Sequence, residues 1–181
     1  GADRAILIEA VADVHVDVEP LAVAKLLAAV VKEEAPGIVL CGKQAIDGDT
    51  AQVGPGLAMR LGVPYATCIQ KIRSADQETI VFERMMDDGY DVLQSGYPLL
   101  MTVVKDINEP RVPSLRGKMK AKKAVIRTLS AEDIKADPAC IGLRGSPTQV
   151  VKVFPPEPRG ARALLSGDID EQVEQLVEKL K

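Results

Sequence analysis

The residues best suited to chemistry lie in the stretch CGKQAIDGDTAQVGPGLAMRLGVP, residues 41–64. An apolar run over residues 38–41 leads to Gly42, a polar loop covers residues 43–49, and a helical pattern begins near Thr50. This order predicts a strand, a loop and the amino end of a helix. Free backbone N–H groups and the positive end of the helix dipole then meet at one place, which favours binding of a phosphate group.

The loop matches neither of the common phosphate-binding motifs. It has neither the GxxxxGK(S/T) spacing nor the GxGxxG spacing. Small residues would let a ligand approach the backbone closely, namely Gly42, Ala45, Gly48 and Ala51. From the residues alone, an ordinary strand-to-helix turn without a ligand stays open as the alternative.

The rest of the chain offers little for catalysis. The single histidine, His15, lies in a Val/Asp-rich segment, and no Ser/His/Asp arrangement is visible. Asp47 and Asp49 could suggest a Mg²⁺ site. The interpretation we favour is that Asp49 or Thr50 caps the helix and that Asp47 bonds to its own loop backbone. We therefore predict neither a catalytic residue nor a metal ligand.

Composition predicts a globular protein of moderate size. The chain has 181 residues, 46% hydrophobic and 27% charged, with a net charge of −3 that argues against general nucleic-acid binding. No apolar run is long enough for a membrane span, and no signal peptide is visible at Gly1. Cys41, Cys68 and Cys140 are widely spaced, which suits reduced thiols and a cytoplasmic location.

Hydrophobic periodicity predicts an α/β fold. We expect a Rossmann-like parallel sheet with helices on both faces, an antiparallel hairpin and an extended C-terminal arm. The expected strands cover residues 5–8, 37–41, 66–73, 79–85, 90–94 and 99–104. The expected helices cover residues 21–34, 50–61 and 168–181, with a further helix start at 130–133. Residues 109–123 should form an exposed loop, and residues 142–158 an extended segment.

Three segments resemble one family. GKQAIDGDTAQVG, residues 42–54, resembles the adenine-nucleotide loop of the β-subunit of electron-transfer flavoproteins. NEPRVPSLRGKMKAKK, residues 108–123, resembles the partner-recognition loop of that subunit, and GADRAILI at the start is a third match in the family's order. The resemblance implies a nucleotide site, with Thr50 and Gln52 as the foremost side-chain contacts. Its residues would be Gly42, Lys43, Gln44, Ala45, Ile46, Asp47, Gly48, Asp49, Thr50, Ala51, Gln52 and Val53.

The resemblance also implies cofactors. In the classical branch of the family the β-subunit holds AMP, and in the electron-bifurcating branch the adenosine part of a second FAD fills the same site and takes electrons from NADH. The forms DGDTAQVGP and SLRG look more like the bifurcating branch. Flavin would supply the redox chemistry, and the protein its position and electrostatics.

Partners follow from the same resemblance. The chain would pair with an α-subunit, and its Leu115, Arg116 and Lys118 would dock an acyl-CoA dehydrogenase or a related flavin dehydrogenase. Ferredoxin is a further candidate partner. From the residues alone, Leu115 could instead be tucked inward.

The resemblance divides the chain into a nucleotide-binding domain, residues 1–125, and a C-terminal arm and helix, residues 126–181, that contacts the α-subunit. Family members have further strand–helix units before the GADRAILI segment, and these are absent here. The alternatives are a nucleotide-binding module without redox function and a structural subunit without nucleotide.

Overall fold

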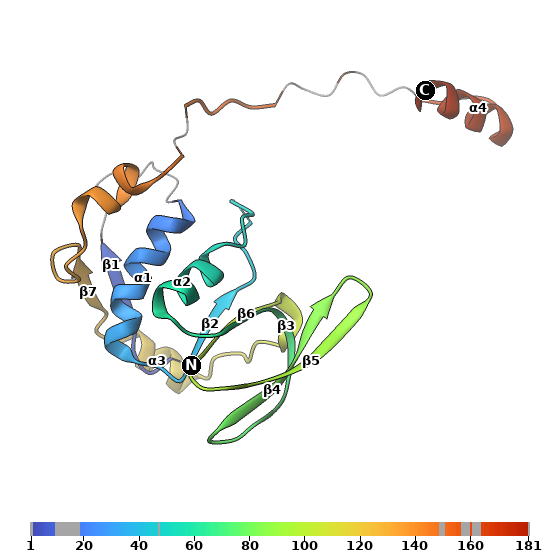
Figure 1. The fold of residues 1–181 in the computed structure, drawn as a ribbon. Helices are drawn as coiled ribbons and strands as arrows, with labels where there is room; N and C mark the ends of the chain where they lie inside the picture. The colour runs from blue at the N-terminus through green and yellow to red at the C-terminus, as the bar shows by residue number, and fades with distance from the viewer. Residues whose placement is uncertain are drawn as a thin grey trace. The chain divides into compact units, whose positions relative to one another are not determined.

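The computed structural model describes residues 2–9, 19–46, 48–148, 151–156, 160 and 164–180. The chain divides into two compact units, Gly1–Val150 and Val151–Lys181. Both sheets belong to the first unit, whereas the last helix belongs to the second (Figure 1). The boundary predicted at residue 125 rests on contacts with another subunit and stays a prediction.

The main sheet of the first unit confirms the α/β prediction. Its strand order is β2-β6-β3-β4-β5. β2, β6 and β3 run parallel, while β4 pairs antiparallel with both β3 and β5. The bounds are β2 Ile38–Gly42, β3 Tyr65–Ala75, β4 Thr79–Met86, β5 Gly89–Gly96 and β6 Leu99–Val103. The predicted parallel strands and the predicted antiparallel hairpin are therefore parts of one sheet.

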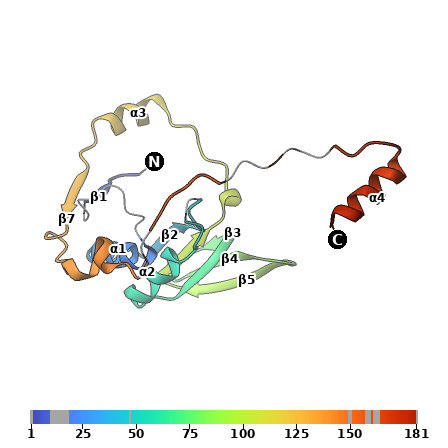
Figure 2. The same ribbon diagram turned by 90° about the horizontal axis from the view of Figure 1, so that it is seen from above.

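Two helices cover one face of this sheet, α1 (Pro20–Glu34) and α2 (Val53–Leu61). They lie side by side in Figures 1 and 2. Ala24 and Ala28 of α1 pack with Leu57 of α2 and Leu100 of β6. The small alanine side chains let the two helices approach each other closely above the sheet.

The start and end of α1 follow from local chemistry. Proline occupies its first turn, where a missing N–H is harmless, and the Glu19 carboxylate accepts the Leu21 N–H at 2.9 Å. The helix ends where Ala35 turns left-handed, with φ of 43°. Pro36 then prevents the helix from continuing.

The opposite face of the sheet carries its own core. Ile69, Phe82 and Met101 are almost fully buried there, together with residues of β3, β4 and β6. Among the residues that the structure describes, helical cover on this face is limited to Ile107 of a single 3₁₀ turn, η1 (Lys105–Ile107). The expected helices on both faces are therefore seen as two α-helices on one face and this turn on the other.

A second sheet pairs β1 (Ile6–Glu9) with β7 (Arg127–Ser130) in parallel. Leu26 and Val30, on the remaining side of α1, pack against Leu129 of β7. α1 therefore connects two sheets, and β1 and β2 do not pair although one helix links them. β7 was not expected.

The helix expected to start at residues 130–133 does not form; a turn takes its place. Ser130 and Asp133 do exchange hydrogen bonds as a helix start would: Asp133 accepts the Ser130 N–H at 2.8 Å, and Ser130 Oγ accepts the Asp133 N–H at 3.2 Å. Lys135 then adopts φ of 50°, so the segment stops after one turn. A 3₁₀ turn, η2 (Pro138–Cys140), follows this segment. Residues 142–158 also differ from the expectation in part, because they begin with a second 3₁₀ turn, η3 (Gly142–Gly145).

The second unit contains α4 (Ile169–Leu180), close to the predicted helix. Residues 151–156 have no regular structure, in keeping with the expected extended arm. The apolar side chains of α4 share one stripe and are all exposed, namely Ile169, Val173, Leu176, Val177 and Leu180. In the part of the chain that the structure describes, no helix has the length and apolar character that crossing a bilayer requires.

A substitution of Thr102, in β6, would test the packing of the main sheet. It is 2% exposed, and its Oγ1 accepts the Cys68 N–H at 3.0 Å where β3 loses register with β6. Thr102→Val keeps the shape but leaves that donor unpaired, so we expect unfolding free energy to fall by about 1–3 kcal/mol in urea titrations. Thr128→Val, at an exposed position of β7, is the control and should change it by less than about 0.5 kcal/mol. Equal losses in both variants would contradict this role.

Candidate functional site

The predicted loop begins where β2 ends. The Lys43 N–H donates to the carbonyl of Val103 at 3.0 Å, which ties the start of the loop to the last residue of β6. The loop therefore leaves the sheet at the carboxyl ends of two neighbouring parallel strands. In open α/β sheets this is the edge at which ligands bind.

The loop has an unusual backbone for its sequence. Asp49 and Ala51 adopt left-handed conformations with φ of 51° and 53°, which residues other than glycine seldom do. The Asp49 N–H donates to the carbonyl of Ala45 at 3.0 Å, and the Gln44 amide hydrogen-bonds the Asp49 carboxylate. Left-handed Ala51 is followed by Gln52 in the right-handed helical region, with φ of −98° and ψ of −20°, and neighbouring left-handed and right-handed residues are the combination found in anion-binding nests. Asp47 lies outside the described residues.

The helix after the loop starts later than predicted. α2 begins at Val53, not near Thr50, because the left-handed residues at positions 49 and 51 cannot belong to a right-handed helix. The residue at the cap position is Gln52, whose side chain makes no capping hydrogen bond, so the predicted cap at Asp49 or Thr50 is wrong. Pro55 has no N–H. The N–H groups of Val53 and Gly54 are therefore the donors that the first turn can offer to a ligand.

Gly54 brings this helix end close to the sheet. A methyl group on Gly54 would collide with Cγ2 of Thr102 and would lie 3.7 Å from Cβ of Cys41. Burial raises the pKa of the Cys41 thiol, which is consistent with its place under the helix. Only glycine thus allows the amino end of α2 to rest directly on β6.

The structure places eleven of the twelve predicted nucleotide residues and leaves out Asp47. Residues 42–52, so far as described, are exposed, and Val53 is partly buried as the first residue of α2. Their assignment to a nucleotide stays a prediction. Sequence reasoning missed Lys71 and Lys105, which lie beside the loop in the same cavity as Lys43. No sequence signal marked them, since they come from segments far from the loop in the chain.

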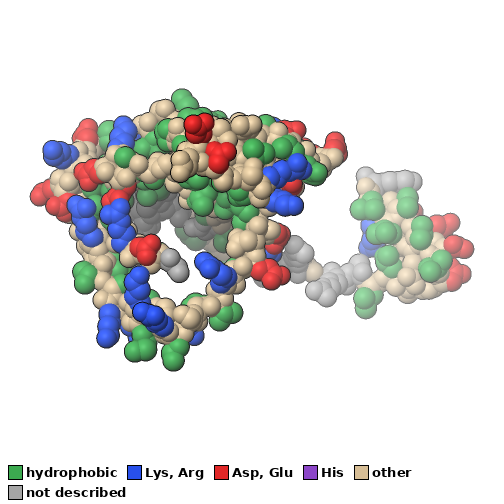
Figure 3. Space-filling view, turned by 90° about the horizontal axis from the view of Figure 1, so that it is seen from below, with side chains coloured by type: hydrophobic (Ala, Val, Ile, Leu, Met, Phe, Trp, Pro, Cys, Tyr) green, Lys and Arg blue, Asp and Glu red, His purple; other side chains and the backbone are tan. Residues whose placement is uncertain are grey.

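The predicted docking segment is not a loop throughout. Residues Leu115–Lys122 form α3, whose amino end is capped by Ser114 Oγ, which accepts the Gly117 N–H at 3.1 Å. None of its residues is buried: Leu115 is 77% exposed and Met119 55%. This exposure does not fit the alternative of a tucked-in leucine. Arg116 and Lys118 are exposed beside Leu115, and Figure 3 shows basic side chains gathered along this part of the chain.

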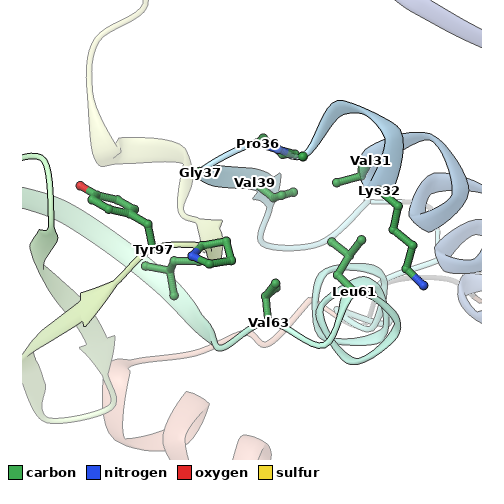
Figure 4. Close-up of a pocket in the computed structure, with 11 residues that line it drawn as sticks. Val31, Lys32, Pro36, Gly37, Val39, Leu61, Val63 and Tyr97 are labelled. Carbon is green, nitrogen blue, oxygen red and sulfur yellow. The ribbon is translucent and has the colours of Figure 1, made fainter.

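A separate cavity of about 450 Å³ lies at the other end of the strands (Figure 4). Gly37 and Pro98, which precede β2 and β6, contribute to its lining, and so do Val31 of α1 and Leu61 of α2. The Tyr97 hydroxyl at its edge is bonded to the carbonyls of Asp76 and Thr79, each at 3.2 Å. This cavity is thus at the end of the sheet opposite the loop. In the described ranges, no group of three or more His, Cys, Asp or Glu could hold a metal ion.

Comparison with known proteins identifies the family. Residues 1–134 match the electron transfer flavoprotein domain. The chain belongs to the electron transfer flavoprotein family. The electron transfer flavoprotein subunit beta of Megasphaera elsdenii is 49% identical over 146 residues, which are 79% of this chain and 54% of the relative.

Two further relatives of this family match most of the chain. The electron transfer flavoprotein subunit beta of Thermoanaerobacterium thermosaccharolyticum is 40% identical over 99% of this chain and 68% of its own length. The caffeyl-CoA reductase-Etf complex subunit CarD of Acetobacterium woodii is 42% identical over 87% of this chain and 60% of its own. The chain thus spans between 54% and 68% of the length of these three relatives.

The contact between Gly54 and Thr102 yields a matched pair of variants. Gly54→Ala should push α2 away from β6 and lower the unfolding free energy by about 1–3 kcal/mol. Gly56→Ala lies in the same helix, where a new methyl would meet only Ala24 Cβ at 3.4 Å. That variant should be neutral or more stable by up to about 1 kcal/mol, because alanine favours a helix over glycine. Thermal and urea unfolding of both proteins provides the measurement, and the same sign for both changes would contradict the close packing.

Proposed function

We propose that this chain forms the adenine-nucleotide site of an electron transfer flavoprotein β-subunit. The observation that carries the proposal is the junction of loop and helix at the carboxyl ends of β2 and β6. Its left-handed residues and the first turn of α2, which has no side-chain cap, would offer backbone donors to a phosphate there. Thr50 and Gln52 would add side-chain hydrogen bonds to the phosphate, and Gly42 would leave room for the ligand, since nothing lies within 4 Å of its missing Cβ.

We propose FAD of the electron-bifurcating branch as the nucleotide, with NADH as electron donor and AMP of the classical branch as the alternative. The motif DGDTAQVGP supports the first choice. When bound, flavin supplies the electron-accepting ring. The residues of this chain would bind and orient the nucleotide through the loop.

The proposed partners use two different surfaces. α3 would dock a flavin dehydrogenase, such as an acyl-CoA dehydrogenase, through Leu115, with Arg116 and Lys118 steering the approach. The extended arm and α4 would bind the α-subunit, because their apolar side chains, including Val151 at 95% and Phe154 at 69%, are exposed. Ferredoxin stays a further candidate partner.

Thr50→Val tests the nucleotide assignment. It removes a hydroxyl bond to a charged group, worth roughly 1.5–3 kcal/mol. The nucleotide content of the purified complex, measured by its flavin spectrum and by chromatography of the released nucleotide, should fall on dilution. Thr128→Val, on exposed β7, should retain the nucleotide fully. Unchanged content in Thr50→Val would remove the support for this site, and AMP in place of FAD would favour the classical branch.

Leu115→Ala tests the docking surface. Burying a leucine in a partner pocket contributes roughly 1.5–3 kcal/mol, so electron transfer to the dehydrogenase should weaken about tenfold or more. The effect should persist at high salt, whereas that of Lys118→Gln should appear mainly at low salt. Stopped-flow kinetics with the dehydrogenase would measure both. Flavin content should not change, and unaltered kinetics in Leu115→Ala would argue against docking here.

A further inference from the structure

The segment that links η1 to β7 is strongly basic. Residues 111–127 contain seven lysine and arginine side chains and no carboxylate, although the whole chain has a net charge of −3. The structure leaves every residue of this segment exposed. Such a separation of charge within an acidic chain favours an anionic partner. The seven basic residues are Arg111, Arg116, Lys118, Lys120, Lys122, Lys123 and Arg127.

α3 arranges part of this charge around an apolar stripe. Leu115 and Met119 are four residues apart in the helix, so their side chains lie one above the other on the same side. Lys118 and Lys122 follow one edge of that side, and Arg116 follows the other, because the helix turns once every 3.6 residues. Leu115 is 77% exposed and Met119 55%. The result is a narrow apolar stripe with cations on both edges.

The one ion pair that the structure gives to α3 leaves this stripe free. Lys120, on a different side of the helix from Leu115 and Met119, pairs with Asp3, with 3.6 Å between Nζ and Oδ1. Figure 2 shows α3 away from both sheets, on the segment that runs between η1 and β7. A flat surface can therefore reach the apolar stripe and the cations beside it.

We propose that α3 binds the surface of an anionic lipid bilayer. Leu115 and Met119 would enter the boundary between headgroups and acyl chains, as the apolar sides of basic interfacial helices do. The long side chains of Lys118, Lys122 and Arg116 would extend from the two edges of the stripe to the lipid phosphates. A layer of anionic headgroups carries negative charge in every lateral direction, so it neutralises the cations on both edges at once.

Other anionic partners fit this segment less well. Proteins that bind single-stranded nucleic acid use aromatic side chains on which the bases stack, and residues 111–127 contain no aromatic residue. An acidic protein surface needs carboxylates opposite individual cations, whereas the cations of α3 point in several directions. The inference adds a lipid surface to the partners under the proposed function and does not depend on dehydrogenase docking through the same helix.

Flotation of the purified complex with lipid vesicles tests this proposal. The wild-type complex should bind vesicles of phosphatidylcholine mixed with phosphatidylglycerol, and it should not bind vesicles of phosphatidylcholine alone. Lys118→Gln should weaken binding about fivefold, the loss expected for one cation at an anionic surface. Leu115→Ala should weaken it about tenfold, because less apolar surface enters the bilayer. Lys32→Gln, at an exposed position of α1, is the control and should leave binding unchanged, whereas added salt should release the protein.

The outcomes distinguish a lipid surface from other partners. Absence of binding to anionic vesicles, or equal binding to both kinds of vesicle, would overturn the inference. Equal losses in Lys118→Gln and Lys32→Gln would also overturn it, because binding would then follow the overall charge and not α3. A single-stranded oligonucleotide that displaces the protein from anionic vesicles would indicate a nucleic-acid partner instead. If Leu115→Ala slows electron transfer to the dehydrogenase but anionic vesicles do not bind, the docking surface stands and the lipid surface is wrong.

Discussion

The contact between β6 and the amino end of α2 is the constraint on which the rest of this structure depends. β6 is the inner parallel strand, paired with β2 on one side and β3 on the other, and Leu99 to Thr102 are all buried. Thr102 faces Gly54 with its methyl group and holds the bulge of β3 with its hydroxyl. One side chain therefore joins the helix, the parallel strands and the hairpin, and so sets where the loop between β2 and α2 can lie.

The sequence predicts those elements whose side chains enter a core. The runs that become β2 and β6, and the spacing that becomes α1, repeat at periods that burial imposes. The start of α2 was placed three residues early because left-handed backbone at Asp49 and Ala51 has no signature in residue type. α3 was missed because an exposed helix has no apolar periodicity. Its formation follows instead from the Ser114 cap and from the helix propensity of Lys, Met and Ala.

The candidate site likewise has one part that the sequence predicts and another that it does not. Its loop is continuous in sequence, so a strand, small residues and a helix start could be recognised together. The cavity beside it is assembled from β3, β4 and the segment after β6, and only folding brings Lys71 and Lys105 next to Lys43. Even Glu83, which looks like an ordinary strand residue, can be buried because Arg73 neutralises its charge and Gln70 donates a further hydrogen bond to its carboxylate. Such pairings need a register between strands that periodicity alone does not provide.

The second unit, unlike the first, has no packed core to stabilise its helix among the residues that the structure describes. α4 has 12 residues, a length at which an isolated helix is marginal in water. Reciprocal bonds between Asp168 and Glu171 cap its amino end, at 3.0 Å and 3.2 Å, and so favour helix initiation. They do not cover the apolar stripe, whose side chains stay exposed within the unit. Most helical stability in proteins comes from packing such a face. A partner that buries the stripe would therefore stabilise α4 and gain affinity from the same apolar surface, which is the physical basis for the proposal that the arm binds another subunit.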